Sequence, residues 1–310
     1  MQYKKSALSN TELLSRLESK GLIIDAPDVA MRALDFIGYF RLRGYALPFM
    51  YPTSEGKKFT SGITFNDILL RYEFDRDLRR LVLGQLESIE IAVRTSICNH
   101  MAIDYGPFWY LNYPMQVLGH QSTKHKVSSP FEMGAFLNHV ERTARRSRDL
   151  HAQHYFKKYS DPLFPPSWLM AECLSFGYWS KLYKHLQKGN QTKGSPKKII
   201  ARKFDLTPSL FESWLHALTF LRNICAHHGR VWNRQFAYRP EVYLKKRDHF
   251  LNQQSFYCYA SVIAIFLEKI NSENGWSKQL VHLFRDYPKI SQDDLGFPSK
   301  LHQDPIWKLS

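Results

Sequence analysis

The sequence contains no apolar run long enough to cross a membrane. Its longest strongly apolar stretch, residues 257–267, falls well short of the ~20 residues that a membrane-spanning helix needs. The first 25 residues are interrupted by charged side chains and lack the apolar core of a signal peptide. We therefore expect a cytoplasmic protein that has no membrane partner.

Cysteine is scarce, and the cysteines that are present form no recognisable framework. None belongs to a CxxC motif, and all four lie within apolar helical patterns: Cys98, Cys173, Cys225 and Cys258. Scattered cysteines of this kind are typical of reduced thiols in a cytosolic protein. We predict no disulfide bonds.

Several motifs of well-known enzymes are also missing. The sequence has no GxxxxGK[ST] loop, no GxGxxG turn after a strand and no GxSxG elbow, so it offers no support for an NTPase, a dehydrogenase or a hydrolase. Cys225, His227 and His228, with Cys98 and His100 as remote helpers, match no zinc-finger or HExxH spacing. We predict no metal and no cofactor.

Acidic residues are too few to balance the basic ones. Lys and Arg number 43 against 28 Asp and Glu, which leaves a net charge of +15 and a pI near 9.6. Such a surface attracts polyanions, with nucleic acid as the first candidate and an anionic membrane surface as the second. A merely basic protein remains the plain alternative, because charge indicates a class of partner and not a reaction.

Helical periodicity dominates the 310 residues, of which 44% are apolar and 15% aromatic. Apolar residues recur at three- and four-residue steps from Ile68 to Met101, which predicts a long amphipathic helix that Gly106 and Pro107 end. With no fixed-period repeat and no run of alternating strands, the fold class is all-α. Further helices are expected over residues 11–20, 28–37, 131–159, 167–186, 208–228, 255–270 and 276–284.

The chain is expected to divide into three parts. Residues 1–64 form an N-terminal helical, aromatic and basic segment packed on the body, residues 65–290 form the main helical domain, and residues 291–310 form an extended tail. Three connectors are expected on the surface because they lack periodicity and are polar or rich in Gly. They are the polar connector 51–64, the exposed loop 112–130 and the Gly- and Lys-rich loop 188–198.

Basic side chains gather in three places that could contact nucleic acid. The aromatic segment 39–49 could stack on bases and neutralise phosphates, but packing of the N-terminal part onto the body is the favoured interpretation. The helix over 131–159 has a basic face, and the loop 188–198 ends in lysines. The candidate RNA-binding residues are Arg41, Arg43, Arg142, Arg145, Arg146, Lys197, Lys198, Arg230 and Arg234. A solvated side chain is the common alternative for Arg230, Arg234 and the loop lysines.

The densest cluster of chemically capable residues lies at residues 221–230. At ~100° per residue, Asn223 and His227 share one helix face, Arg222 flanks them, and Ile224 and Cys225 can face the core. The next residue, His228, points ~100° away from its neighbour and is kept as a secondary candidate. A surface of this composition suits a scissile phosphate.

Cleavage of RNA by its own 2′-hydroxyl needs groups of just these kinds. One group removes the proton of the nucleophile, another donates a proton to the leaving 5′-oxygen, and positive charge stabilises the phosphate oxygens. An imidazole can do either proton transfer near neutral pH, and a guanidinium stays charged and grips phosphate with two donors. Such a reaction needs no metal.

The residues from Arg222 to His227 resemble the R-x4-6-H motif of HEPN ribonucleases, and the surrounding sequence resembles abortive-infection (Abi) proteins of the AbiD and AbiF kind. The resemblance covers roughly residues 20–235, and the ordered set of matches is more specific than the short motif. The matching blocks are IGYFRLRGY (37–45), YEFDRDLR (72–79), ESIEIAVRT (87–95), YGPFWY (105–110), LSFG (174–177) and residues 223–233.

This resemblance implies a HEPN-type helical bundle with additional N- and C-terminal helices. It also implies a metal-independent endoribonuclease that acts in phage defence or as a toxin with an antitoxin. Arg222 would bind phosphate, His227 would act as general acid or base, and Asn223 would position the substrate or His227. The implied partners are RNA, as substrate and as a regulatory structured small RNA, and a second copy of the chain whose motif completes a composite site.

Glu90 and Arg94 lie one turn apart on the long helix and are supporting candidates. A surface ion pair between them is the plain interpretation, and a position beneath Arg222 and His227 is the sharper one. The main rival function is a non-catalytic basic helical module that binds RNA or a protein and uses Arg222 and His227 structurally. An exposed His227 near Arg222 favours the enzyme, whereas a sealed His227 favours the module.

Overall fold

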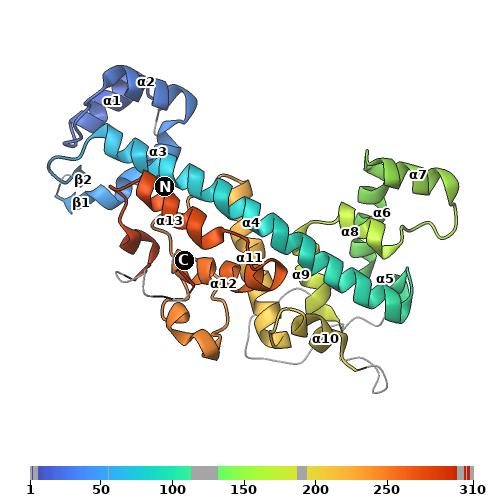
Figure 1. Ribbon diagram of the computed structural model, residues 1–310. Helices are drawn as coiled ribbons and strands as arrows, with labels where there is room; N and C mark the ends of the chain where they lie inside the picture. Colours follow the sequence, from blue (N-terminus) through green and yellow to red (C-terminus); the bar gives the residue numbers. More distant parts are fainter. Residues whose placement is uncertain are drawn as a thin grey trace.

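The computed structural model describes residues 6–54, 56–112, 132–186 and 194–298, together with residues 2, 304, 306 and 307. Helices dominate it, which confirms the all-α prediction (Figure 1). The α-helices are α1 (Asn10–Glu18), α2 (Pro27–Phe36), α3 (Tyr39–Ala46), α4 (Phe65–Tyr105), α5 (Trp109–Asn112), α6 (Met133–Arg146), α7 (Leu150–Lys158), α8 (Ser167–Cys173), α9 (Phe176–His185), α10 (Pro196–Arg202), α11 (Pro208–Ala226), α12 (Phe256–Ile270) and α13 (Trp276–Asp286). The short 3₁₀ helices are η1 (Leu47–Phe49), η2 (Leu244–Phe250) and η3 (Gln292–Leu295).

The predicted long helix is α4, which forms the spine of the molecule. Thr64 begins it with a reciprocal capping box to Asp67, and Gly106 ends it in a positive-φ conformation that suits glycine. Its 41 residues span about 60 Å at 1.5 Å per residue. Helices α3, α8, α9, α10, α11, α12 and α13 all pack against it. Among the described helices, none is long and apolar enough to span a bilayer.

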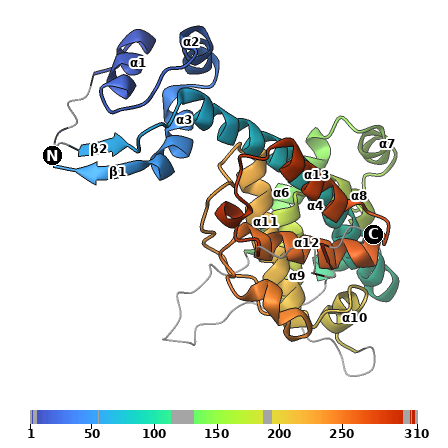
Figure 2. The same ribbon diagram turned by 60° about the vertical axis from the view of Figure 1, so that its left-hand side comes forward.

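The N-terminal lobe, made of α1, α2, α3 and a β-hairpin, gathers at the first turns of α4 (Figures 1 and 2). In the hairpin, β1 (Met50–Thr53) runs antiparallel to β2 (Gly56–Phe59), with Met50 opposite Phe59. The segment 51–64, predicted only as a polar connector, therefore contains most of a hairpin that the sequence did not predict. The strands are short and polar, so their sequence lacks alternation, and the Phe59 amide donates to the Lys20 carbonyl (2.8 Å) far back in the chain.

Helices α11 and α12 lie at the centre of the body. Both begin as predicted: Thr207 accepts a hydrogen bond from the Leu210 amide (3.2 Å), and Ser255 accepts one from the Cys258 amide (3.3 Å). The core around them is rich in aromatic rings, among them Trp214 stacked on Phe250. The buried helix expected over residues 255–270 is confirmed as α12.

Two predicted helices are each broken into two. The helix expected over 131–159 becomes α6 and α7, because Ser147 is extended and Asp149 caps a new helix by accepting from the His151 amide (2.8 Å). The helix expected over 167–186 becomes α8 and α9, because Leu174 and Ser175 are extended. Local capping and extended backbone at two or three residues override an otherwise continuous helical period.

The expected extended tail is partly folded onto the body. Asp304 accepts from the Tyr257 hydroxyl (2.9 Å) and lies 2.8 Å from His249 Nε2, and Trp307 is only 1% exposed among Tyr257, Trp276 and Phe297. The tail prediction was therefore wrong for these residues. The predicted loop 112–130 beyond residue 112, the first part of the loop 188–198 and the rest of the tail lie outside the described residues.

Candidate active site at the end of α11

The candidate site lies where α11 ends, and a specific turn determines that end. The Gly229 amide donates to the Ile224 carbonyl (2.7 Å) and the His228 amide to the Cys225 carbonyl (3.1 Å), which is a Schellman motif. His228 occupies the left-handed position (φ +58°) where glycine is usual. A Cβ atom on Gly229 would approach Ile224 Cγ2 to 3.1 Å. The helix therefore stops at Ala226, two residues before the predicted end at residue 228.

The motif presents its polar side chains to solvent. Asn223 and His227 are both exposed, and they lie one turn apart on one face of α11. Ile224 and Cys225 are buried on the opposite side, as the periodicity predicts. Burial raises the pKa of the Cys225 thiol to about 12, so this cysteine stays protonated and inert beside the exposed imidazole.

Arg222 points to a different side of α11, toward α4. On an ideal helix it lies about 140° around the axis from His227, and its Nε atom is 3.8 Å from Glu90 Oε2. The Glu90 side chain is only 13% exposed. Burial raises the pKa of the Glu90 carboxyl, while the positive charges of Arg222 and Arg94 act in the opposite direction. Glu90 thus lies beside Arg222, as the sharper of the two interpretations expects.

Arg94 takes part in a different ion pair. Its guanidinium binds Glu172 on α8 (3.0 Å). Its charge still acts on Glu90, one turn earlier on α4. Two ion pairs, Arg222 with Glu90 and Arg94 with Glu172, therefore follow each other along the spine, and both differ from the simple Glu90–Arg94 pair.

A buried polar cluster, here called the Asp75 clamp, holds the chain that follows the motif. Asp75 is fully buried on α4 and accepts hydrogen bonds from the Trp232 amide (2.7 Å), the Val231 amide (3.0 Å) and the Tyr45 hydroxyl (2.6 Å). Arg79, one turn later, forms an ion pair with the same carboxylate. Burial raises the pKa of the Asp75 carboxyl, and Arg79 and the hydrogen bonds counteract that effect. The clamp joins α3, α4 and the segment after α11.

The N-terminal lobe also touches the turn of the motif directly. Arg41 on α3 donates a hydrogen bond to the His228 carbonyl (2.7 Å), 187 residues away in sequence. Gly44 on the same helix lies 3.8 Å, measured from an ideal Cβ position, from Arg230 Nε. Tyr45 stacks on Trp232 with a centroid distance of 6.2 Å. These contacts support the interpretation that the segment 39–49 packs the N-terminal part onto the body.

A cavity of about 840 Å³ lies along α11 on the face that carries Asn223 and His227. Four residues of α11 line the cavity: Ser209, Glu212, Ser213 and His216. On an ideal helix all four lie within about 60° of His227 around the helix axis, so they share its face. The rest of the wall includes aromatic rings, cations and two further carboxylates: Tyr178, Tyr238, Lys181, Lys184, Arg239, Glu132 and Glu241. The His216 ring lies 4.2 Å from the Tyr238 ring, and desolvation together with the charge of Lys184 lowers the pKa of His216.

The predicted RNA-binding side chains are distributed over several environments. Arg142 and Arg146 line a hollow of about 610 Å³ beside Glu172. Lys198 is exposed, although it lies in the first turns of α10 rather than in a loop. The others engage groups of the chain or another cavity: Arg145 binds Glu141, Lys197 binds Glu212, Arg230 and Arg234 donate to backbone carbonyls, Arg41 binds the His228 carbonyl and Arg43 lines a cavity of the N-terminal lobe.

Sequence reasoning missed two features of this region. The Asp75 clamp carries a signal, because a charged residue between Phe74 and Leu78 on the buried period of α4 must find partners. The cavity along α11 carries another, because polar residues repeat at helical spacing from Ser209 to His227. Neither signal indicates which distant residues complete the cluster.

The fold and the motif together define an all-helical protein with an exposed Arg-x4-His sequence at a helix end. The family model described as Abi-like protein matches residues 32–233, and the chain belongs to this family. The match begins in α2 and ends just after Trp232, so it contains the spine, the motif and the clamp. A search of curated proteins and a search of solved structures each found no match. Membership in the family suggests a role in abortive infection.

Proposed function

We propose that this Abi-like protein is a metal-independent endoribonuclease of the HEPN type that acts in phage defence as a toxin. The observation that carries the proposal is the exposure of His227 and Asn223 at a helix end held by the Asp75 clamp, with Arg222 on a different side of the same helix end. A histidine that serves only the fold is normally packed and hydrogen-bonded. His227 is instead open to a substrate, while the residues around it are fixed by the Asp75 clamp.

The chemistry divides among four side chains. His227 transfers a proton, either from the 2′-hydroxyl or to the leaving 5′-oxygen. Arg222 binds the phosphate and stabilises the charge that develops on its oxygens, and Glu90 orients the guanidinium from below. Asn223 positions the substrate or the imidazole. Because Arg222 and His227 leave α11 on different sides, a second copy of the chain that faces this helix end would bring a full set of groups around one phosphate.

We place the RNA strand along α11, from the motif to the cavity beside His216. Eleven residues separate His216 from His227, which is about 16 Å along the helix axis. The rings of Tyr178 and Tyr238 offer stacking surfaces for bases, and Lys181 offers a charge for the backbone. This path favours single-stranded RNA, whose bases are free to leave the stack and enter the cavity.

The first test is cleavage of labelled RNA by the purified protein in EDTA, followed by analysis of the ends. We expect 2′,3′-cyclic phosphate products from the wild type, and a loss of on the order of 100- to 10,000-fold in Arg222→Ala and His227→Ala. Matched controls are Arg202→Ala and His151→Ala, which alter exposed residues of α10 and α7. Both controls should cut like the wild type.

The competing function is a non-catalytic module that binds RNA or a protein. RNA binding without cutting, unchanged by Arg222→Ala or His227→Ala, would establish that function instead. The path along α11 is tested separately in the His227→Ala background, where binding is measured without cleavage. Tyr238→Ala should weaken binding of a single-stranded oligonucleotide by about 5- to 160-fold, since stacking on one base contributes ~1–3 kcal/mol. Lys181→Ala should also weaken binding, because it removes a positive charge from the path of the backbone.

Two further parts of the proposal concern partners. A homodimer would complete the site, and a structured small RNA would restrain or direct it. Light scattering of the purified protein, with and without RNA, measures the first. Recovery of a defined RNA species with the wild-type protein from its own cells tests the regulatory RNA. A protein that cuts RNA but is monomeric at every concentration assayed would contradict the composite site.

A further inference from the structure

The N-terminal lobe contains a partly enclosed cavity of its own, separate from α11. It has a volume of about 150 Å³ and lies between α1, α2, α3, the hairpin and the first turn of α4. Most of its wall is apolar, with Leu34, Leu42 and Phe65 among the buried side chains that line it. A cavity of about 150 Å³ lined by apolar side chains is large enough to hold benzene.

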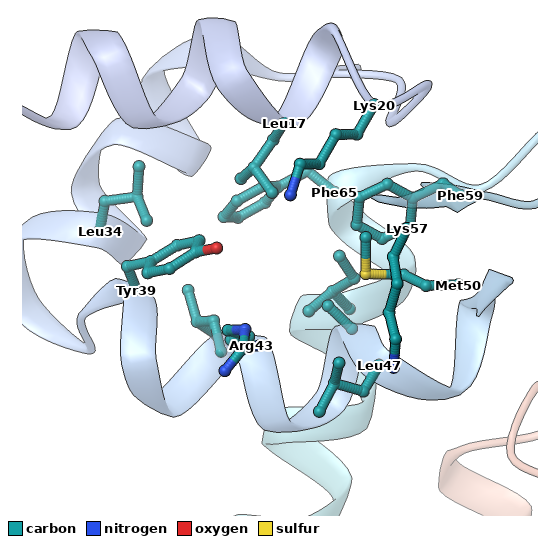
Figure 3. A pocket seen from close by; sticks show the side chains of 13 residues that line it. Leu17, Lys20, Leu34, Tyr39, Arg43, Leu47, Met50, Lys57, Phe59 and Phe65 are labelled. Carbon is teal, nitrogen blue, oxygen red and sulfur yellow. The ribbon is translucent and has the colours of Figure 1, made fainter. Parts of the chain in front are cut away.

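The charged groups among the described residues that line this cavity share one sign of charge. Lys20, Arg43 and Lys57 line it together with Tyr39, and no carboxylate is found among the described residues that line it. Figure 3 shows the Tyr39 hydroxyl and the Lys20 ammonium directed into the open centre, with Arg43 on the opposite side from Lys20. An apolar space edged by cations is complementary to a molecule with an apolar body and an anionic head.

The helix that forms one wall of the cavity also contacts the motif. On α3, Tyr39, Leu42, Arg43 and Ala46 share the face toward the cavity, and Arg41 and Tyr45 lie on the opposite face. Arg41 binds the His228 carbonyl and Tyr45 binds Asp75. A ligand that fills the cavity would pack against the same helix that contacts the end of α11 through Arg41 and Asp75 of α4 through Tyr45.

We propose that the N-terminal cavity binds a small amphipathic anion, an aromatic or branched aliphatic body with a carboxylate or phosphate group, and that its occupancy stabilises the turn at His228 through α3. The binding part stands on the cavity alone. The regulatory part rests on the proposed ribonuclease function, since the turn at His228 follows the proposed catalytic histidine.

Binding is tested by calorimetry on the full chain with benzoate, phenyl phosphate and the neutral benzyl alcohol as probes. We expect at least one anion to bind tenfold or more tightly than benzyl alcohol, and the comparison of the two anions distinguishes a carboxylate from a phosphate site. Arg43→Gln should remove this preference, and Ala46→Leu should abolish binding of all three probes by filling the space. Arg32→Gln, an exposed arginine on α2 of the same lobe, is the matched control.

Either of two binding results would overturn the site: no saturable binding of either anion, or binding that Ala46→Leu leaves unchanged while the variant melts like the wild type. Arg43 is exposed, so Arg43→Gln should leave the core intact. The effect of this variant on the preference for an anion over benzyl alcohol can therefore be measured even if Ala46→Leu fails to fold.

The link to the motif is tested by amide hydrogen exchange at His228, Val231 and Trp232. Saturation with the bound anion should slow exchange there at least threefold in the wild type, and Arg41→Gln should bind the anion but lose this effect at His228. Unchanged exchange at saturation would overturn the link. These measurements do not use RNA, so they remain interpretable if cleavage is never observed; if cleavage is observed, the anion should increase its rate severalfold in the wild type and not in Arg41→Gln.

Discussion

The Asp75 clamp and the Arg222–His227 motif lie next to each other at the end of α11, but water reaches only one of them. In the clamp, Asp75 and Arg79 are almost fully buried, and a hydroxyl, two backbone amides and a guanidinium bind the carboxylate. In the motif, Asn223 and His227 are exposed and Arg222 is partly exposed. One cluster fixes the backbone, and the other leaves its side chains open for chemistry. Substitutions should therefore separate stability from activity.

The largest effect on stability is expected for Asp75→Ala. This change leaves the Arg79 guanidinium and the amides of Val231 and Trp232 buried without their acceptor, which should cost about 3–5 kcal/mol of unfolding free energy. Urea denaturation measures it, with Glu87→Ala, an exposed residue of the same helix, as the control expected within ~0.5 kcal/mol of the wild type. A loss below about 1 kcal/mol would show that the clamp does not hold the fold.

Arg41→Gln should have a smaller effect on stability and a measurable one on activity. It removes one charged hydrogen bond to the His228 carbonyl at a solvent-exposed site, so we expect a loss of about 1 kcal/mol. The turn beside His227 should loosen, and RNA cleavage should fall. Arg32→Gln, an exposed arginine on α2 of the same lobe, should change neither. Equal behaviour of the two variants in denaturation and cleavage would argue against a specific role for the Arg41 contact.

Glu90→Gln should reveal the protonation of Glu90 through the pH dependence of stability. Burial raises the folded-state pKa of this carboxyl, so its ionisation opposes folding once the pH rises above its ordinary value of 4.5. Wild type and variant should differ least near pH 4, and the variant should be the more stable by on the order of 1 kcal/mol or less at pH 7. Urea titrations at both pH values, with Glu87→Gln as the exposed control, measure this difference. If Glu90→Gln lost stability relative to the wild type between pH 4 and pH 7, the pKa of Glu90 in the folded protein would be lowered and not raised.

The smallest change is expected for His228→Gly. Glycine adopts the left-handed conformation without strain but gains freedom in the unfolded chain, so the two effects should nearly cancel, to within a few tenths of a kcal/mol. His228→Val should instead cost more than about 1 kcal/mol, because a branched side chain is strained at this position. If His228→Gly retained its stability but lost cleavage as His227→Ala does, His228 would belong to the chemistry and not to the turn.

Periodicity and capping predicted most of the helices that position the site. The repeat from Ile68 to Met101 is long enough to determine α4, and Thr207 with Pro208 marks the start of α11. The same reasoning placed Asn223 and His227 on one helix face and allowed Ile224 and Cys225 to face the core, because these positions follow from local spacing; the exposure of His227 came from the structure. The chemical roles of Arg222 and His227 stay predictions until cleavage is measured.

Features that depend on residues far apart in sequence could not be predicted. The carboxylate of Asp75 could have chosen any buried donor, and its actual partners lie 30 residues before it and 156 residues after it. The hairpin was missed because its strands are polar and too short to alternate, and the breaks at Ser147 and Leu174 depend on a few local torsion angles. Arg41 was a reasonable candidate for RNA binding until the structure placed it on the carbonyl of His228.

The partners of the Asp75 clamp lie far apart in sequence, so the clamp forms late during synthesis of the chain on the ribosome. Val231 follows Asp75 by 156 residues, and at a synthesis rate of about 5–20 residues per second the ribosome needs roughly 8–30 s to add them. Until then the Asp75 carboxylate has only Tyr45 and Arg79 as partners and lacks the two amides of the segment after α11, and the turn that follows His227 has not been completed. A nascent chain therefore passes through most of its translation without the arrangement that we assign to RNA cleavage, which would spare the ribosome and message that produce it.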